Sequence, residues 1–468
     1  MKNIEVIFGA PGCGKTHYLM SVLDGLFKAY EPEEVAFVSF TRKGSYEGRD
    51  RAVEKFEKPA SAFKYFKTLH AIAFEKLGMT NPEIMTRMNY REFSKAMGMS
   101  FLGYYTEDLT NRDDKYLNHI SLEKNNPALA VKSGGDLDLR KLKYVRANYE
   151  RYKFEKGLKD YDDLMEECNK MGDALPVKVA IIDEAQDLTS MQWDFCYNSF
   201  KDCEMVYIAG DDDQAIYEWA GADVKRFLSI ARKSKMLILD KSYRLRQNIL
   251  ELSKVVISQV KDRVVKDFSA VGEGGGIFYH NSIDEIVVNN EQSYYFLSRN
   301  NTFLKAYKEK LIKTGMQFSI KGEDFGKANT YKMIMKYEEL RKNDPDAIRT
   351  NVLLMGSLKP MATTDLPWYE ALEMKENVLS FWRNFFSNKS EIKNTGLNIS
   401  TIHGVKGGEA DNVVLSMNVT RTINDAMQSK DFIAAELRCL YVGMTRAKKN
   451  LHIVHSNSKF GYESLLQI

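Results

Sequence analysis

Residues 9–16 read GAPGCGKT, a stretch that fits the phosphate-binding P-loop pattern GxxxxGK[ST]. The apolar run at residues 4–8 predicts a buried strand, and the apolar positions that follow Thr16 predict a helix. Glycines let backbone N–H groups turn inward around phosphate oxygens, and the start of the helix adds a partial positive charge. The stretch therefore predicts a nucleoside triphosphate site, in which Lys15 reaches the β and γ phosphates and Thr16 binds Mg²⁺.

The composition is that of an ordinary globular protein. With 468 residues the chain has room for two to four domains, and its net charge of +3 neither requires nor excludes a nucleic-acid partner. The five cysteines lack CxxC spacing, which argues against a disulfide framework or a zinc site and favours buried cysteines in a reducing cytosol. The sequence shows no leader pattern at its start and no long apolar run. We therefore expect a cytoplasmic protein with no membrane segment.

Short apolar runs alternate with helix-length segments along the chain. The first series covers residues 35–40, 179–182, 205–209 and 236–239, and the second covers 294–297, 397–402, 413–415 and 451–454, with a helical stretch at about 430–447. This alternation predicts an α/β fold with two RecA-like P-loop lobes, each a parallel sheet flanked by helices. We expect the first lobe at 1–80 and 151–243 with an insertion at 81–150, and the second at 244–326 and 395–468 with an insertion at 327–394.

Both insertions are expected to be small and mainly helical, and the second contains a group of aromatic residues. In the second insertion the spacing of these residues suits one helical face packed into a small core: Trp368, Phe381, Trp382, Phe385 and Phe386. Residues 140–159 interleave basic residues with Tyr144, Tyr149, Tyr152 and Phe154. This segment fits either a surface that follows a phosphate backbone or a solvated helix face packed by its aromatic stripe, and we favour the helix face.

Two acidic segments follow predicted strands of the first lobe. The segment VKVAIIDEAQD (177–187) places Asp183 at the end of a strand, where it can share Mg²⁺ with Thr16. Glu184 beside it can orient and deprotonate the attacking water. In AGDDDQAIYEWAGAD (209–223), Gln214 can hydrogen-bond the γ phosphate.

Tyr217 and Trp219 follow Gln214 closely. Bases of a single strand stack on aromatic side chains for about 1 to 3 kcal/mol each, so these two residues can grip an unpaired strand near the phosphate sensor. The alternative is that they anchor the loop in a hydrophobic pocket.

The order of these motifs, across nearly the whole chain, resembles that of the UvrD/Rep family of superfamily 1 DNA helicases. In the first half the similar segments are FVSFTRKG (37–44), KTLHAIAFEKL (67–77), DYDDLM (160–165), IIDEAQD and GDDDQAIYEW. In the second half they are LDKSYRLRQNIL (239–250), FLSRNN (296–301), STIHGVKGGEADNVV (400–414) and ELRCLYVGMTRAKKNL (436–451). The resemblance implies a compact, phage- or bacterial-type member of this family, which uses ATP and Mg²⁺.

The resemblance also implies roles for individual residues. DNA contacts fall on Phe40, Thr41, Thr68, His70, Tyr217, Trp219, Arg299, Thr401, His403 and Lys406. Nucleotide contacts fall on Gly9, Ala10, Pro11, Gly12, Cys13, Gly14, Lys15, Thr16 and His17, with Tyr243 stacking on the base and Glu409 on the ribose. The expected catalytic residues are Lys15, Asp183, Glu184, Gln214, Arg244 and Arg446. An arginine that reaches the γ phosphate is worth roughly 10³ to 10⁵ in rate, which supports the last two assignments.

Several positions depart from the family pattern. Eight residues precede Gly9, so the glutamine motif that reads adenine upstream of the P-loop is absent, and His17 stands where the family has an arginine. We therefore expect loose base specificity, with GTP or other triphosphates as substitutes. Leu69, Ala220 and Gly408 replace a phenylalanine, an arginine and a leucine, and both insertions are short, which predicts looser coupling.

The sequence thus predicts an ATP-driven motor that moves on single-stranded DNA and opens duplex at single-strand/duplex junctions. The resemblance implies 3′ to 5′ movement, and we expect a monomer with replication or repair proteins as candidate partners. One alternative is a translocase that removes bound proteins with little unwinding. Another is a P-loop switch or phosphotransferase that does not act on nucleic acid, and hydrolysis indifferent to single-stranded DNA would favour it.

Overall fold

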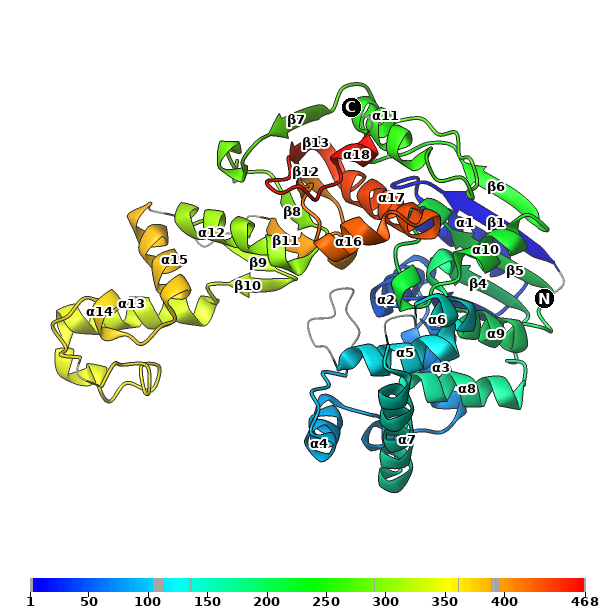
Figure 1. Cartoon of the computed structure of the whole chain (residues 1–468), viewed down its shortest axis with the longest axis horizontal. Coiled ribbons are helices and arrows are strands. Elements are labelled where there is room, and N and C mark those ends of the chain that lie inside the picture. Colours follow the sequence, from blue (N-terminus) through cyan, green and yellow to red (C-terminus); the bar gives the residue numbers. More distant parts are fainter. Residues whose placement is uncertain are drawn as a thin grey trace. The chain divides into compact units, whose positions relative to one another are not determined.

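The computed structural model describes residues 3–103, 113–133, 137–289, 291–360, 362–388, 390 and 396–466. The chain forms two compact units, whose elements are labelled in Figure 1. The first comprises Met1–Arg244, Ile257–Val271 and Ile433–Cys439, and the second comprises Leu245–Val256, Gly272–Phe432 and Leu440–Ile468. Each unit contains one sheet with helices packed against it.

The sheet of the first unit has six strands, all parallel, in the order β3-β2-β4-β5-β1-β6. Its strands are β1 (Ile4–Gly9), β2 (Val35–Ser39), β3 (Phe66–Thr68), β4 (Val179–Asp183), β5 (Met205–Gly210) and β6 (Lys235–Leu239). Strands β2 and β4 are buried along their whole length, as expected when helices cover both faces of a parallel sheet. Because the strands are parallel, all six carboxyl ends meet at one edge.

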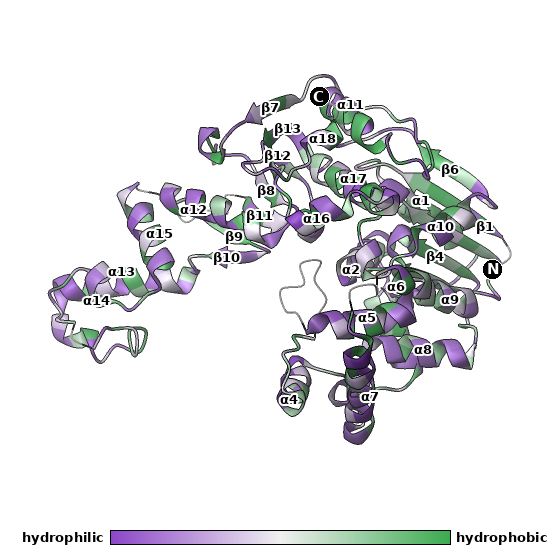
Figure 2. Ribbon diagram, in the orientation of Figure 1, coloured by the Kyte–Doolittle hydropathy of each residue, from purple (hydrophilic) through white to green (hydrophobic). Residues whose placement is uncertain are grey.

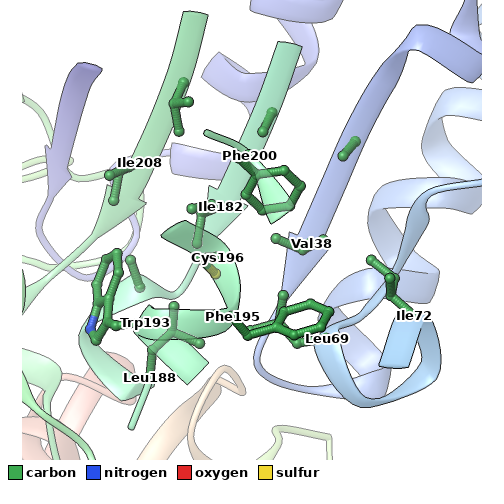
Figure 3. Packing of buried hydrophobic residues seen from close by; sticks show 14 of the residues in the cluster. Val38, Leu69, Ile72, Ile182, Leu188, Trp193, Phe195, Cys196, Phe200 and Ile208 are labelled. Atoms are coloured by element: carbon green, nitrogen blue, oxygen red, sulfur yellow. The ribbon is translucent and has the colours of Figure 1, made fainter. Parts of the chain in front are cut away.

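Six helices flank this sheet: α1 (Lys15–Leu26), α2 (Arg42–Phe56), α3 (Leu69–Lys76), α8 (Tyr161–Met171), α9 (Ser190–Ser199) and α10 (Val224–Ala231). Neighbouring residues of a strand point to opposite faces, so Phe37 and Val38 of β2 enter different cores. Val38 packs with Ile182, Ile208 and Trp193 in the larger core, which Figure 3 shows. The two cores fix the sheet between its helical layers.

The described residues between 81 and 158 of the first unit are mainly helical. They include α4 (Arg87–Met97), α5 (Asp114–Asn125), α6 (Pro127–Ser133) and α7 (Leu139–Lys156), and they have a hydrophobic core of their own that contains Tyr90, Phe93, Leu117, Val145 and Tyr149. Helix α7 is largely hydrophilic (Figure 2). Five of its cations form ion pairs with acidic residues: Lys141, Arg146, Arg151, Lys153 and Lys156. This pairing supports the helix-face interpretation of residues 140–159.

The sheet of the second unit has seven strands in the order β10-β9-β11-β8-β12-β13-β7. These are β7 (Gly276–His280), β8 (Tyr294–Ser298), β9 (Phe318–Ile320), β10 (Glu323–Phe325), β11 (Leu397–Thr401), β12 (Ala410–Ser416) and β13 (Ala447–Val454). All neighbours are parallel except the β9–β10 hairpin. The remaining helices outside residues 327–390 are α11 (Gln247–Ile257), α12 (Leu304–Thr314), α16 (Arg421–Ala426), α17 (Lys430–Met444) and α18 (Glu463–Leu466).

Residues 327–390 of the second unit contribute α13 (Ala328–Asn343), α14 (Trp368–Ala371) and α15 (Glu376–Ser387). The predicted packing of the aromatic residues into a core is confirmed, but they do not lie on one helical face, because Trp368 belongs to α14 and the others to α15. Trp368, Phe381, Trp382 and Phe385 are buried, and Phe386 is partly buried against them. These side chains are therefore packing residues.

The predicted fold class, an α/β chain of parallel sheets flanked by helices, is confirmed. The boundaries of lobes and insertions stay a prediction, and the division by contacts groups residues 257–271 with the first unit rather than the second. All five cysteines are buried and free of disulfide bonds, as expected. Across the part of the chain that the structure describes, no helix is both long and apolar enough to cross a membrane.

Candidate active site

The predicted site residues of the first unit share the carboxyl edge of its sheet. Taken across the sheet from β6 through β1, β5, β4 and β2 to β3, the edge carries residues 243–244, 10–16, 211–214, 183–184, 40–41 and 68–70. The predicted nucleotide contacts lie toward β6, and the predicted DNA contacts at residues 40–41 and 68–70 lie toward β3. Strand order alone thus arranges the two groups side by side.

The P-loop runs from β1 into α1. Gly14 has a φ of 78° and lies at the amino end of α1, where its carbonyl accepts a hydrogen bond from the N–H of Tyr18. Lys15 Nζ donates to the carbonyl of Gly9 over 2.8 Å. A Cβ on Gly9 would lie 2.3 Å from Lys15 Cγ, so only glycine lets the lysine side chain fold along the loop.

Three carboxylates set the charge of this site. Burial alone would lower the pKa of Lys15, but the carboxylates of Glu184, Asp211 and Asp183 raise it above its ordinary value. Burial, followed by the charge of Glu184, raises the pKa of Asp183 to about 7 against the opposing effect of Lys15. Lys15 is therefore charged, and a cation near Asp183 would be stabilised.

Thr16 and Asp183 fit a bound Mg²⁺. Magnesium prefers hard oxygen ligands, and it is commonly held by a carboxylate together with phosphate oxygens and water. The buried Asp183 carboxylate, whose ionised form is disfavoured by burial, gains from a neighbouring cation. The hydroxyl of Thr16, at the second position of α1, supplies the other predicted ligand.

Glu184 is held in an uncommon backbone conformation. Its φ of 53° lies in the left-handed region, which costs a non-glycine residue on the order of 1 kcal/mol. Its N–H donates to Asp183 Oδ1 over 2.9 Å, and its Oε2 accepts from Gln186 Nε2 over 2.6 Å. These contacts aim the Glu184 carboxylate and limit its movement.

A hydrogen-bonded chain joins Glu184 to Gln214, and we call it the coupling chain: Glu184, Gln186, Asp211 and Gln214. Beyond the Glu184 contact, Gln186 Oε1 accepts from the N–H of Asp211 over 3.0 Å. Asp211 Oδ2 accepts from Gln214 Nε2 over 2.6 Å. Sequence reasoning missed Gln186 and Asp211, although both lie inside the quoted motifs.

Three aromatic side chains form a row near the coupling chain. We call them the aromatic row: Phe40, Tyr217 and Trp219. The ring centroids of Phe40 and Tyr217 are 5.6 Å apart, and those of Tyr217 and Trp219 are 6.4 Å apart in an edge-on arrangement. All three are partly exposed. The structure therefore brings together aromatic residues from two motifs that lie far apart in the sequence.

The other predicted DNA contacts of the first unit cap or precede helices. Thr41 caps α2, with its hydroxyl accepting from the N–H of Gly44, and Thr68 caps α3 by accepting from Ala71. His70 packs edge-on against Tyr161. Burial and then the charge of Arg42 lower the pKa of His70 to about 4, so this imidazole is neutral at neutral pH.

Tyr243 and Arg244 lie against the P-loop within the first unit. The N–H of Tyr243 donates to the carbonyl of Gly12 over 2.8 Å, and the hydroxyl of Ser242 donates to the carbonyl of Pro11 over 2.8 Å. A Cβ on Gly12 would lie 2.3 Å from Arg244 Cβ. The Tyr243 side chain is 66% exposed, as a base-stacking ring must be before nucleotide binds.

The predicted residues of the second unit lie at two edges of its sheet. Arg299 follows β8 and Thr401 ends β11, and these strand ends are neighbours because Ser298 is paired with Thr401. His403 follows in the same turn, and all three side chains are buried. Glu409 and Arg446 instead precede β12 and β13, at the amino edge, and Lys406 lies on the connection between the edges.

Arg446 is 1% exposed, and its guanidinium is bonded to its own unit. Nε donates to the carbonyl of Val442 over 3.0 Å, and Nη1 donates to the carbonyl of Gly408 over 3.1 Å. A Cβ on Gly408 would lie 2.5 Å from the hydroxyl of Tyr295, so a side chain at this position would require Tyr295 to shift.

Residues 1–235 match the model of the UvrD/REP helicase N-terminal domain, and residues 370–458 match that of the UvrD-like helicase C-terminal domain. The chain belongs to the UvrD/REP helicase family. This UvrD/REP chain is 23% identical to the ATP-dependent DNA helicase PcrA of Leuconostoc citreum, over 80% of its own length and 55% of that protein.

Another relative of this UvrD/REP chain matches it over a similar share of its length. It is 23% identical to PcrA of Bacillus subtilis over 73% of its length and 52% of that protein. It therefore spans about half the length of the curated relatives it matches. A solved arterivirus helicase, nonstructural protein 10, aligns with 99% of the chain and has 62% of its own length covered, at 10% identity and a TM-score of 0.38, which is too weak a likeness to describe this fold.

Proposed function

We propose that this UvrD/REP family member is an ATP-dependent DNA helicase, which moves 3′ to 5′ along single-stranded DNA and opens duplex at junctions. The observation that carries the proposal is the coupling chain, because it runs along one sheet edge from Glu184 beside the P-loop to Gln214. Tyr217, the central member of the aromatic row, follows Gln214 by three residues. A change at the γ phosphate therefore has a short covalent and hydrogen-bonded route to side chains that stack on bases.

The nucleotide half of the edge supplies the hydrolytic groups. Lys15 binds the β and γ phosphates, and the fixed carboxylate of Glu184 orients and deprotonates the attacking water. Arg244 and Arg446 neutralise charge on the transferred phosphoryl group. Thr16 and Asp183 would hold Mg²⁺, which would supply positive charge against the phosphates.

The DNA half of the edge grips the strand. Bases stack on Phe40, Tyr217 and Trp219, while Thr41, Thr68 and neutral His70 offer hydrogen bonds rather than charge to the strand. The second unit adds contacts from Arg299, Thr401, His403 and Lys406. We extend the proposal to a cytoplasmic monomer that works with replication or repair proteins.

The test is hydrolysis by the purified chain, with and without single-stranded DNA, for ATP, GTP and CTP. We expect strong stimulation by single-stranded DNA in the wild-type chain and none in Glu184→Gln, which keeps the shape and the hydrogen-bond chain but not the basic carboxylate. Equal hydrolysis with and without DNA would contradict a nucleic-acid motor and favour a P-loop switch. Comparable rates with GTP and CTP would support loose base specificity.

A further inference from the structure

The first unit buries a cluster of charges behind the coupling chain. Asp211, Asp212 and Asp213 are at most 1% exposed, and we call them the acidic triad. Lys266 Nζ lies 3.1 Å from Asp211 Oδ1, 2.5 Å from Asp212 Oδ1 and 2.9 Å from Asp213 Oδ2. Arg263 donates two hydrogen bonds to Asp213, over 2.7 and 2.5 Å.

Lys266 takes the place that a metal ion would fill among these carboxylates. One oxygen of each lies within 4.8 Å of the others, a spacing that suits a cation. The Lys266 side chain is fully buried, and its ammonium lies 5.5 Å from the centroid of the Phe8 ring in β1. Several kcal/mol are lost when a buried ion has no partner, so the triad depends on this one ammonium and on Arg263.

Asp211 links the acidic triad to the coupling chain. One of its carboxylate oxygens contacts Lys266, and the other accepts the amide of Gln214. Burial would raise the pKa of Asp211, but Lys266 and then Lys15 hold it below its ordinary value. Burial and the charges of Asp213 and Asp211 instead raise the pKa of Asp212, despite Lys266. The pKa values of Asp211 and Asp212 therefore shift in opposite directions.

We propose that Lys266 is a positioning residue for Gln214: its ammonium keeps Asp211 ionised, and the ionised carboxylate holds the Gln214 amide toward the γ phosphate. This inference rests on the proposed function, which gives Gln214 its phosphate contact. The charged groups that face Asp211 are Lys15, Lys266 and the neighbouring carboxylates, with Arg263 engaged by Asp213. Without Lys266, three buried carboxylates would share Arg263 and the more distant Lys15.

The test is the pH dependence of DNA-stimulated ATP hydrolysis in Lys266→Met. We expect hydrolysis to be weak near neutral pH and to recover at alkaline pH, with the acid limb shifted upward by about one pH unit or more. Adding Asp212→Asn removes one repelling charge, so the double variant Lys266→Met/Asp212→Asn should return toward the wild-type profile. Lys266→Arg should behave like the wild-type chain.

A purely structural role gives a different result. If Lys266 only ties residues 257–271 to the first unit, its loss lowers hydrolysis equally at all pH values. Removing Asp212, a second tie, then makes the defect worse. Asp262→Asn is the matched control, because it breaks the exposed Arg232–Asp262 pair of the same segment without touching the acidic triad, and its profile should not shift.

Folding and activity are read separately. If Lys266→Met does not fold by circular dichroism, the double variant decides: a folded, active double variant supports charge balance, and an unfolded or inactive one overturns the proposal. A wild-type chain with no hydrolysis would refute the proposed function instead. The thermal midpoint of Lys266→Met, measured against pH, then tests the charge balance of the acidic triad. Loss of the ammonium raises the pKa of the triad carboxyls, so the stability of this variant should fall as pH rises. Asp212→Asn should reduce that fall.

Discussion

Lys15 is a partly buried cation whose charge is matched by the carboxylates of Glu184, Asp211 and Asp183. We expect Lys15→Ala to abolish ATP hydrolysis and leave the chain folded, because the change removes a phosphate contact and little core volume. Hydrolysis and circular dichroism measure the two effects. Lys55→Ala is a control, since it removes an exposed pair with Asp24 and a cation–π contact with Phe56, both outside the nucleotide site, and should leave hydrolysis and folding unchanged. Near-normal turnover in Lys15→Ala would refute the site.

Arg446 differs from an exposed arginine finger because its guanidinium is already bonded to the carbonyls of Val442 and Gly408. We expect Arg446→Ala to bind ATP but to hydrolyse it at least about a hundredfold more slowly. Arg446→Lys keeps the positive charge but lacks the planar guanidinium. We therefore expect it to be better folded than Arg446→Ala and to hydrolyse ATP nearly as slowly. Binding of a fluorescent nucleotide measures the binding step, and single-turnover hydrolysis measures the chemical step. Loss of binding with a normal hydrolysis step would contradict the role.

His70 gives a pH prediction. Burial, with Arg42, lowers its folded-state pKa to about 4, whereas an unfolded histidine titrates near 6.5. The unfolded chain takes up this proton first, so the stability that neutral His70 contributes is complete above about pH 6.5 and is lost as pH falls toward 4. We expect His70→Gln to lose less free energy of unfolding than the wild-type chain between pH 7 and about pH 4.5. Urea titrations check this, and equal losses would contradict it.

At the scale of elements, the aromatic row spans the end of β2 and the loop after β5. We expect Trp219→Ala to slow movement along single-stranded DNA more than it slows basal hydrolysis, because the change removes one stacking surface worth about 1 to 3 kcal/mol per base and leaves the P-loop intact. Tyr197→Ala is a suitable control, since this tyrosine is 55% exposed on α9 and belongs to neither half of the edge. Unchanged movement in Trp219→Ala would make the tryptophan a packing residue.

Sequence patterns predicted the elements that are strongly apolar and missed the others. The buried runs of β1, β2, β4 and β5 were readable, but β3 has three residues, and β7 carries Phe278 and Tyr279 with about half of each side chain exposed. Neither gives a clear period of two. Motif spacing placed Asp183 and Gln214 correctly at strand ends. It gave no sign of Lys266, because a lysine far along the chain joins the acidic triad only through the fold.

At the scale of the whole molecule, the free energy gained by stacking a base on an aromatic side chain is similar to the free energy needed to separate one base-pair step. Opening one base-pair step costs on average about 1.4 kcal/mol, and one base stacked on an aromatic side chain gains about 1 to 3 kcal/mol. Capture of each freed base by the aromatic row is therefore enough to bias opening of the duplex by one step. The energies therefore allow the proposed unwinding.

Direction and unwinding are tested together on tailed substrates. We expect the chain to separate a duplex that carries a 3′ single-stranded tail and to leave one with a 5′ tail intact, because 3′ to 5′ movement from the tail reaches the junction only in the first. Streptavidin should likewise be displaced from the 5′ end of a biotinylated single strand and not from the 3′ end. Lys15→Ala should do neither. Displacement of streptavidin without separation of the 3′-tailed duplex would make the chain a protein-stripping translocase, and the opposite tail preference would reverse the polarity.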